Sequence, residues 1–260
     1  MKLPLWADIK AIFALGIPMS MIRFVQMLIS FIGLMMLGNL GPNILAAGAL
    51  MSNLRITIML MFLPVFFAVG VMISRAVGEN KPADVGVIMQ MGLVLALLLS
   101  IPYMLLMDYT GALLHFFHQP PQLIPYVVAY MHYLTWNGPA LFMLVVFQQV
   151  CFATKQQHLV LINAVFTVIC TSLLTYALIH GLWGLPKMGV QSFSFSLSLM
   201  WWEAVVYYLI VLNTVKIFKP FRLFDWRFAG NWSVFRKIIN IGWPMAAQYG
   251  GELLTSMAFM

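Results

Sequence analysis

Long apolar segments separated by short polar turns dominate this sequence. A helix needs about 20 mostly apolar residues to cross the hydrocarbon core of a bilayer. The pattern therefore predicts seven transmembrane helices, of which the last is cut short and the fourth is long enough to extend beyond one membrane face. The expected segments are 11–37, 44–73, 86–107, 122–153, 158–180, 190–214 and 235–260.

One stretch of the chain occurs twice. Residues 6–34 and residues 232–260 align at a constant offset of 226 positions. The repeat predicts that a second long unit begins near the end of the chain. The shared positions are Trp6 and Trp232, Lys10 and Arg236, Gly16 and Gly242, Pro18 and Pro244, Met19 and Met245, and Ser30 and Ser256.

The composition fits an integral membrane protein. Hydrophobic residues make up 63% of the chain and charged residues 8%, whereas soluble domains carry roughly 25% charged residues. The net charge is +7, but the basic residues are dispersed between apolar spans, so we expect a lipid bilayer as partner and no nucleic acid. Cys151 and Cys170 lie in apolar runs, which favours packing roles over a disulfide.

The distribution of Lys and Arg predicts the orientation. Eleven of the fourteen lie before the first segment or in alternate loops, and such residues mark the cytoplasmic side. The N-terminus is then cytoplasmic, and six helices return the chain to that side, so the second unit begins in the same orientation. Parallel repeats are typical of carriers. We expect an N-lobe at 1–214, a cytoplasmic linker at 215–237 and the start of a second lobe at 238–260.

Several ordered motifs match one known family, and together they cover the whole chain. They are Gly16-Ile17-Pro18, the run from Leu37 to Gly48, the run from Ser74 to Asn80, the run from Gly181 to Val190, and Gly242-Trp243-Pro244. With these motifs the sequence resembles the multidrug and toxic compound extrusion (MATE) transporters.

The resemblance implies an all-α membrane carrier of twelve helices in two six-helix lobes. Such a carrier exports amphipathic small molecules across the cell's inner (plasma) membrane by alternating access, coupled to influx of Na⁺ or H⁺ and with no other cofactor. By this comparison five helices are absent from the sequence. We expect either a fragment that works with a missing C-lobe, or a half-transporter that pairs with a second copy. A truncated half-protein that does not transport is a third possibility.

The chain departs from the family pattern in two helices and follows it in a third. Where the first helix of the family commonly has an Asp, this chain has Gly33, and where the fifth helix often has two Asn, it has Thr171 and Thr175. Glu252 falls where part of the family keeps a glutamate in the seventh helix. The resemblance therefore implies that ion coupling rests on Glu252, and it leaves N-lobe coupling open.

Ionisable side chains inside apolar spans are functional candidates, because each costs about 2.5–3.5 kcal/mol at a helix centre. Glu252 is interpreted as a Na⁺ ligand or proton carrier, or else as a structural hydrogen-bonding group. Arg23 and Arg55 are expected at similar depths, where they either contact substrate or form a structural ion pair with Glu203. Two arginines without a nearby acid would favour an anionic or lipid-linked substrate, as in flippases of the same superfamily. That function stays open beside multidrug export.

The remaining candidates carry weaker signals. Gln26 occupies the position of Glu252 in the first repeat and joins Thr171 and Thr175 as a possible cavity residue. Three prolines are candidate helix bends, because proline removes a backbone hydrogen bond: Pro18, Pro64 and Pro244. His115 and His118 lack a third ligand nearby, so no metal site is expected. The sequence carries no hydrolase, zinc-peptidase or nucleotide-binding motif, which indicates that the protein is not an enzyme.

Overall fold

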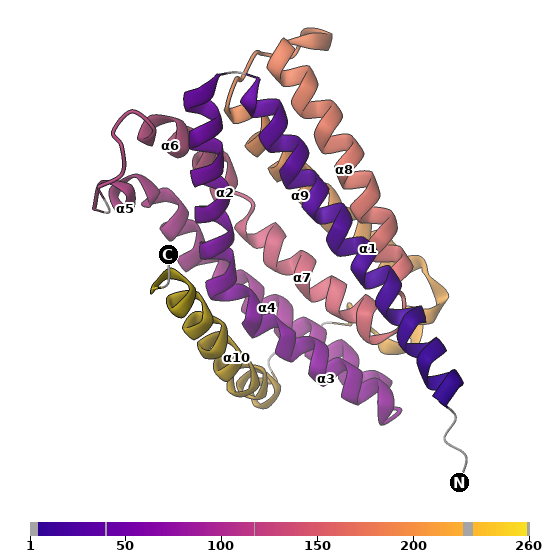
Figure 1. Cartoon of the computed structure of the whole chain (residues 1–260). Helices are drawn as coiled ribbons and strands as arrows, with labels where there is room; N and C mark the ends of the chain where they lie inside the picture. The colour runs from indigo at the N-terminus through magenta and orange to yellow at the C-terminus, as the bar shows by residue number, and fades with distance from the viewer. Residues whose placement is uncertain (1–4, 40, 117, 226–230, 259–260) are drawn as a thin grey trace.

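The computed structural model of the chain describes residues 5–39, 41–116, 118–225 and 231–258. These residues form α-helices joined by turns and short 3₁₀ segments (Figure 1). The elements are α1 (Leu5–Gly38), α2 (Pro42–Phe62), η1 (Leu63–Phe66), α3 (Phe67–Gly78), α4 (Pro82–Asp108), α5 (Thr110–Phe116), α6 (Ile124–Thr135), α7 (Gly138–Ala153), α8 (Gln157–His180), η2 (Leu182–Gly184), α9 (Gln191–Thr214), η3 (Lys216–Phe221) and α10 (Trp232–Ala258).

Six apolar spans emerge from the described residues when a bent helix pair is counted as one. They correspond to the first six predicted segments. The seventh predicted segment corresponds to α10, which is not among these spans over the residues that the structure describes, so a seventh span stays a prediction. The second half of α10 contains the sequence Gln248-Tyr249-Gly250-Gly251-Glu252, and these residues lower its mean hydropathy.

The fourth predicted span is bent rather than overlong. It consists of α6 and α7, whose axes differ by 56°. The sequence at the break is Asn137-Gly138-Pro139. Proline suits the first turn of a new helix, where its missing N–H is not needed, and it disfavours a helical residue before it. The extra length is therefore used by a change of direction inside the lobe.

Helix α4 forms the centre of the lobe, and α1 lies at its edge. Most of the α4 span is buried against α2, α3, α6, α7 and α10, whereas little of α1 is covered. Helix α1 lies beside α8, and α10 packs on the opposite side of the lobe against η1, α3 and α4 (Figure 1). Both α1 and α10 start at the lower end of the view and run upward.

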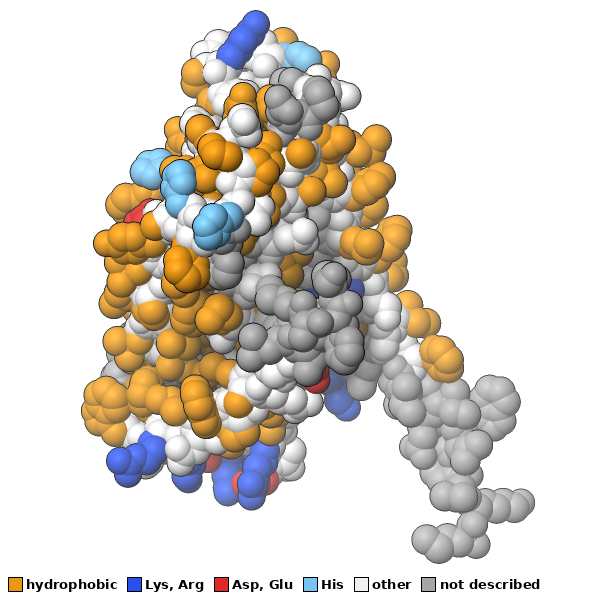
Figure 2. All heavy atoms as spheres, turned by 60° about the vertical axis from the view of Figure 1, so that its left-hand side comes forward, with side chains coloured by type: hydrophobic (Ala, Val, Ile, Leu, Met, Phe, Trp, Pro, Cys, Tyr) orange, Lys and Arg blue, Asp and Glu red, His pale blue; other side chains and the backbone are white. Residues whose placement is uncertain are grey.

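Charged and apolar side chains occupy different zones of the described surface. Figure 2 shows a group of Lys and Arg side chains at the lower end, an orange hydrophobic cover above them and a single basic side chain at the top. That end contains the turn between α3 and α4 and the segment after α9. An apolar belt beside a basic rim fits a protein that crosses a membrane.

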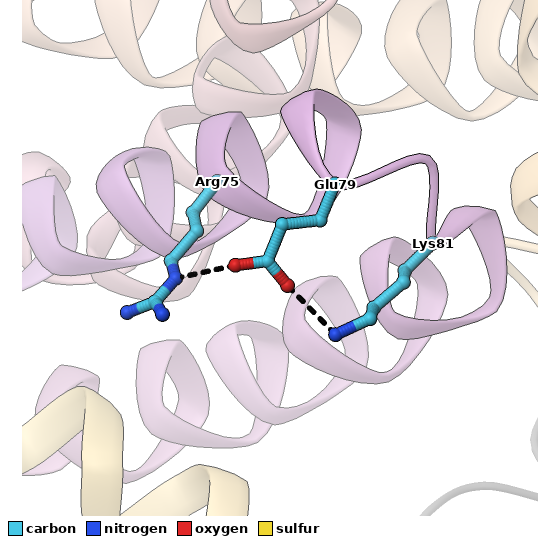
Figure 3. A network of polar contacts seen from close by, with 3 residues as sticks. All are labelled: Arg75, Glu79 and Lys81. Carbon is cyan, nitrogen blue, oxygen red and sulfur yellow. Dashed lines mark hydrogen bonds and ion pairs between the residues drawn. The ribbon is translucent and has the colours of Figure 1, made fainter.

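The turn between α3 and α4 is held by a small ionic network (Figure 3). Glu79 accepts a hydrogen bond from Arg75 Nε at 2.7 Å and another from Lys81 Nζ at 2.7 Å. The backbone turns at Asn80, whose φ of 56° suits asparagine. The bond from Lys81, followed by that from Arg75, lowers the pKa of Glu79 from 4.5 to about 2. The carboxylate is therefore charged at all physiological pH values.

Candidate substrate and ion sites

Among the described residues, no acidic side chain pairs with Arg55 inside the lobe. Its side chain on α2 is only 9% exposed. One terminal nitrogen donates to Ser30 Oγ of α1 at 3.5 Å, which is the long limit of a hydrogen bond, and the buried Nε has no partner. The guanidinium lies within electrostatic range of Tyr103 and Tyr130. The site is thus a buried cation with an unused donor and two buried tyrosines within electrostatic range.

Arg23 has a different environment from Arg55. Its side chain on α1 is exposed, and no hydrogen bond or ion pair joins it to the described residues. Gln26, one turn further along the same helix, is half-buried. The structure therefore does not bring the two arginines together in one enclosed site.

The ion pair considered between an arginine and Glu203 does not form. Glu203 on α9 lies near Cys170 and Tyr207, and one of its carboxylate oxygens is buried without a hydrogen bond. Among the described residues, the salt bridges are those that Glu79 makes with Arg75 and Lys81. The expectation fails because equal depth in the membrane does not place α2 and α9 side by side: each packs mainly on other helices.

A polar stripe follows the inward face of α8, which packs against α1 and α9. The stripe contains Thr171 and Thr175, together with two residues that the sequence analysis did not select, Asn163 and Thr167. All four are buried and recur every fourth position. The hydroxyls of Thr171 and Thr175 and the amide nitrogen of Asn163 make no hydrogen bond within the described residues. Such groups are available to water or to a polar ligand.

The place of the missing acid in α1 is filled by an aromatic ring. A Cβ built on Gly33 would lie 2.4 Å from two ring atoms of Phe193 on α9. That ring is buried and stacks on Tyr130, with 6.3 Å between the ring centres. The glycine therefore allows close packing of α1 on α9, and this position has no room for a carboxylate.

The three predicted bend prolines occupy unlike settings. Pro64 lies in η1, where the second span changes from α-helical to 3₁₀ geometry, while Pro18 and Pro244 lie inside continuous helices. Helix α10 docks on η1: a Cβ on Gly242 would lie 2.8 Å from the Val65 carbonyl oxygen. Whether any of the three prolines acts as a hinge stays a prediction.

Glu252 lies on the exposed side of α10. It accepts a long hydrogen bond of 3.4 Å from Gln248, one turn earlier on the same helix. Tyr249, between them in sequence, contacts the Phe67 ring of α3 at a centroid distance of 6.2 Å. Helix α10 thus contacts the lobe through Tyr249, while the Glu252 side chain is exposed.

Comparison with known proteins decides the family. The model of the MatE family matches residues 18–177, which is more than half of the chain. The chain belongs to the MatE family. Its first five spans lie within or overlap the matched region.

Curated relatives extend the match over most of this chain and half of their own length. It is 28% identical over 245 residues to a probable multidrug resistance protein NorM of Mesorhizobium japonicum, with 93% of this chain and 52% of the relative covered. It is 29% identical over 242 residues to the multidrug resistance protein NorM of Burkholderia vietnamiensis, with 92% and 51% covered.

A solved structure of an outward-facing multidrug resistance MATE family transporter has the same fold. The TM-score is 0.81 at 17% identity, over 92% of this chain and 52% of that one. The chain therefore spans about half the length of the proteins that it matches. As a MatE member it has the all-α membrane architecture that its motifs predicted.

Two interior features of this MatE chain escaped the sequence analysis. Asn137, at the bend between α6 and α7, is buried with both side-chain polar atoms unpartnered. Asn163 and Thr167 complete the α8 stripe. The four-residue spacing of the stripe was visible in the sequence. The bend at Asn137 was signalled only by the Gly-Pro that follows it.

Proposed function

We propose that this chain supplies the N-terminal lobe of a secondary active exporter of amphipathic small molecules. The exporter works by alternating access and is driven by influx of Na⁺ or H⁺, with no other cofactor. The observation that carries the proposal is the docking of α10 on η1, in the same direction as α1, in a MatE chain. Its curated relatives are named as multidrug resistance proteins.

The proposed arrangement is residues 1–214 as one lobe, 215–237 as the linker and 238–260 as the start of a second lobe. Residues 226–230 and 259–260 lie outside the described part. The partner is a set of C-lobe helices or a second copy of this chain. The basic end in Figure 2 supports an inner-membrane protein with a cytoplasmic N-terminus and linker.

Glu252 is the proposed coupling group. It is an exposed carboxylate in the second half of α10. A second lobe or second copy would enclose it. Enclosure raises the pKa of a carboxylate and makes protonation at neutral pH accessible, and a partner's oxygens would complete a Na⁺ site.

The test is gradient-driven efflux from proteoliposomes. The chain is reconstituted alone, and also fused to the C-terminal half of the Burkholderia vietnamiensis relative. We expect the monomeric chain alone to be inactive and the fusion to export a cationic dye under a Na⁺ or pH gradient. Glu252→Gln should lower gradient-driven export by at least about fivefold, the low end of ordinary coupling.

The control is Glu79→Gln, which removes an exposed carboxylate at the basic end of the lobe. It should leave export unchanged. If Glu252→Gln retains full coupling, its assigned role is wrong. If the monomeric chain transports alone, the two-lobe proposal is wrong.

Arg55 supports a second candidate, export or flipping of an anionic or lipid-linked substrate. A buried guanidinium without an acid favours an anionic group, because Arg presents several donors in a planar fork. The same charge repels a cationic drug from the lobe interior. Of the two arginines, only Arg55 is buried as a binding site for an anionic group requires, because Arg23 is exposed.

Arg55→Gln and Arg23→Gln provide matched variants for this candidate. If Arg55 binds the substrate anion, Arg55→Gln should lower export of an anionic compound by roughly tenfold or more, the value of a charged hydrogen bond. It should spare or raise export of a cationic dye, and Arg23→Gln should change neither. Unchanged export of both compounds by Arg55→Gln would remove the second candidate.

A further inference from the structure

A cavity of about 510 Å³ opens where the chain leaves α9. It is lined by the last turn of α9, by η3 and by the four residues that follow: Leu212, Asn213, Phe218, Lys219, Arg222, Leu223, Phe224 and Asp225. This volume lies within the range of roughly 300–1,000 Å³ that is usual for ligand sites. The cavity is lined by other elements than those that carry Arg55, on α2, and Glu252, on α10.

The cavity has a charged rim, and the apolar side chains beneath it are buried. Leu212, Phe218 and Leu223 are each at most 3% exposed, whereas Lys219 and Arg222 are exposed. Asp225 also lines the cavity, so the lining carries one net positive charge. That charge matches a singly charged anion.

Helix α4 supports the segment that lines the cavity. The amide nitrogen of Gln90, which is fully buried, donates to the Leu223 carbonyl at 3.1 Å and to the Asp225 carbonyl at 3.0 Å. A Cβ on Gly86 would lie 2.5 Å from the Phe221 carbonyl oxygen and 2.9 Å from that of Arg222. Glycine at this position therefore allows the segment to lie directly on the helix.

Arg222 is kept in an uncommon conformation by this bracing. Its φ is 47°, in the left-handed region that a long side chain rarely adopts. Such strain persists only where the surroundings impose it, and it is frequent at binding sites. The conformation positions a guanidinium at the rim, where it presents a fork of donors suited to phosphate.

We propose that this cavity binds the phosphodiester headgroup of an anionic membrane lipid. Lys219 and Arg222 hold the phosphate, and the lipid chains lie in the bilayer beside the end of α9. The end of a membrane span lies at headgroup depth, where basic pockets between helices attract anionic lipids. The inference goes beyond the proposed export function and does not depend on it.

Lipid retention by the whole 260-residue chain tests the proposal. The chain is purified from nanodiscs that contain equal amounts of phosphatidylglycerol and phosphatidylcholine, and the retained lipids are counted by native mass spectrometry. We expect selective retention of phosphatidylglycerol. The double variant Lys219→Gln/Arg222→Gln should weaken it by roughly thirtyfold, since each basic residue near an anionic surface contributes about fivefold.

The matched control is Lys155→Gln/Lys216→Gln. It removes the same charge from exposed residues outside the cavity lining, and it should retain the lipid. Equal loss in both double variants would show general surface attraction and overturn the proposal. Displacement of the lipid by millimolar inorganic phosphate would also overturn it, because the occupant would then be a soluble anion. Circular dichroism of each variant confirms that the helices remain folded.

Discussion

Helices α1 and α10 carry matching Gly-x-Pro motifs, yet the two glycines meet different surroundings. Around Gly16 nothing lies within 4 Å of a built Cβ, whereas Gly242 lies against the backbone of Val65. Helix α1 instead makes its close approach further along, where Gly33 meets Phe193. Two copies of a local sequence can thus share a direction and differ in the surface they use for packing.

The largest expected effect on stability comes from overpacking the contact between α10 and η1. Gly242→Ala places a methyl group 2.8 Å from a backbone carbonyl that cannot rotate away. We expect it to lower the free energy of unfolding by about 1–3 kcal/mol, as overpacking generally does. SDS or thermal unfolding in detergent measures the change. Its match, Gly16→Ala, should instead stabilise α1 by about 0.5–1 kcal/mol, and equal effects of the two variants would remove the contrast.

A smaller effect is expected for the close approach in α1. Gly33→Ala collides with the Phe193 ring, which is a side chain and has some freedom to move. We expect a loss of roughly 1–2 kcal/mol. In a Phe193→Ala background the same substitution should cost nothing, because the ring is gone. A double-mutant cycle measures this coupling, and additive effects would show that the ring does not set the spacing.

The smallest effect on stability is expected for the ionic network of Arg75, Glu79 and Lys81, which joins residues close together in the sequence. The two cationic neighbours lower the pKa of Glu79 to about 2, so the charged network stabilises the fold above pH 4.5 and loses that contribution as the pH falls toward 2. Lys81→Met should raise the pKa of Glu79 toward its ordinary value. Carbon-13 NMR of the labelled carboxylate follows this titration. A titration near pH 4.5 in the unchanged protein would mean that the bonds in Figure 3 do not persist in solution.

The spans were predictable because hydrophobic length is a property of consecutive residues. Six of the seven expected segments lie in spans that the structure contains, and the Lys and Arg pattern that predicted the orientation appears as one basic end. The bend in the fourth span was missed. Excess length and a Gly-Pro pair are compatible with an overhang as well as with a bend.

The candidate site was only partly accessible from sequence. Depth along a helix could be counted, and it placed Arg23 and Arg55 near one level. The direction in which each side chain points depends on how its helix is rotated and on which neighbours it has. Those factors buried Arg55, exposed Arg23 and separated both from Glu203.

By itself, the sequence determined the membrane class, the spans, the repeat and the family, because each is encoded in local hydrophobicity, charge and motif order. Tertiary structure alone decided that a ring fills the place beside Gly33, that no acidic side chain among the described residues pairs with Arg55 and that Gln90 braces the segment after α9. Each of these features depends on residues that are far apart in the chain and are brought together by the fold. Close packing of whole helices, rather than any local preference, selects them.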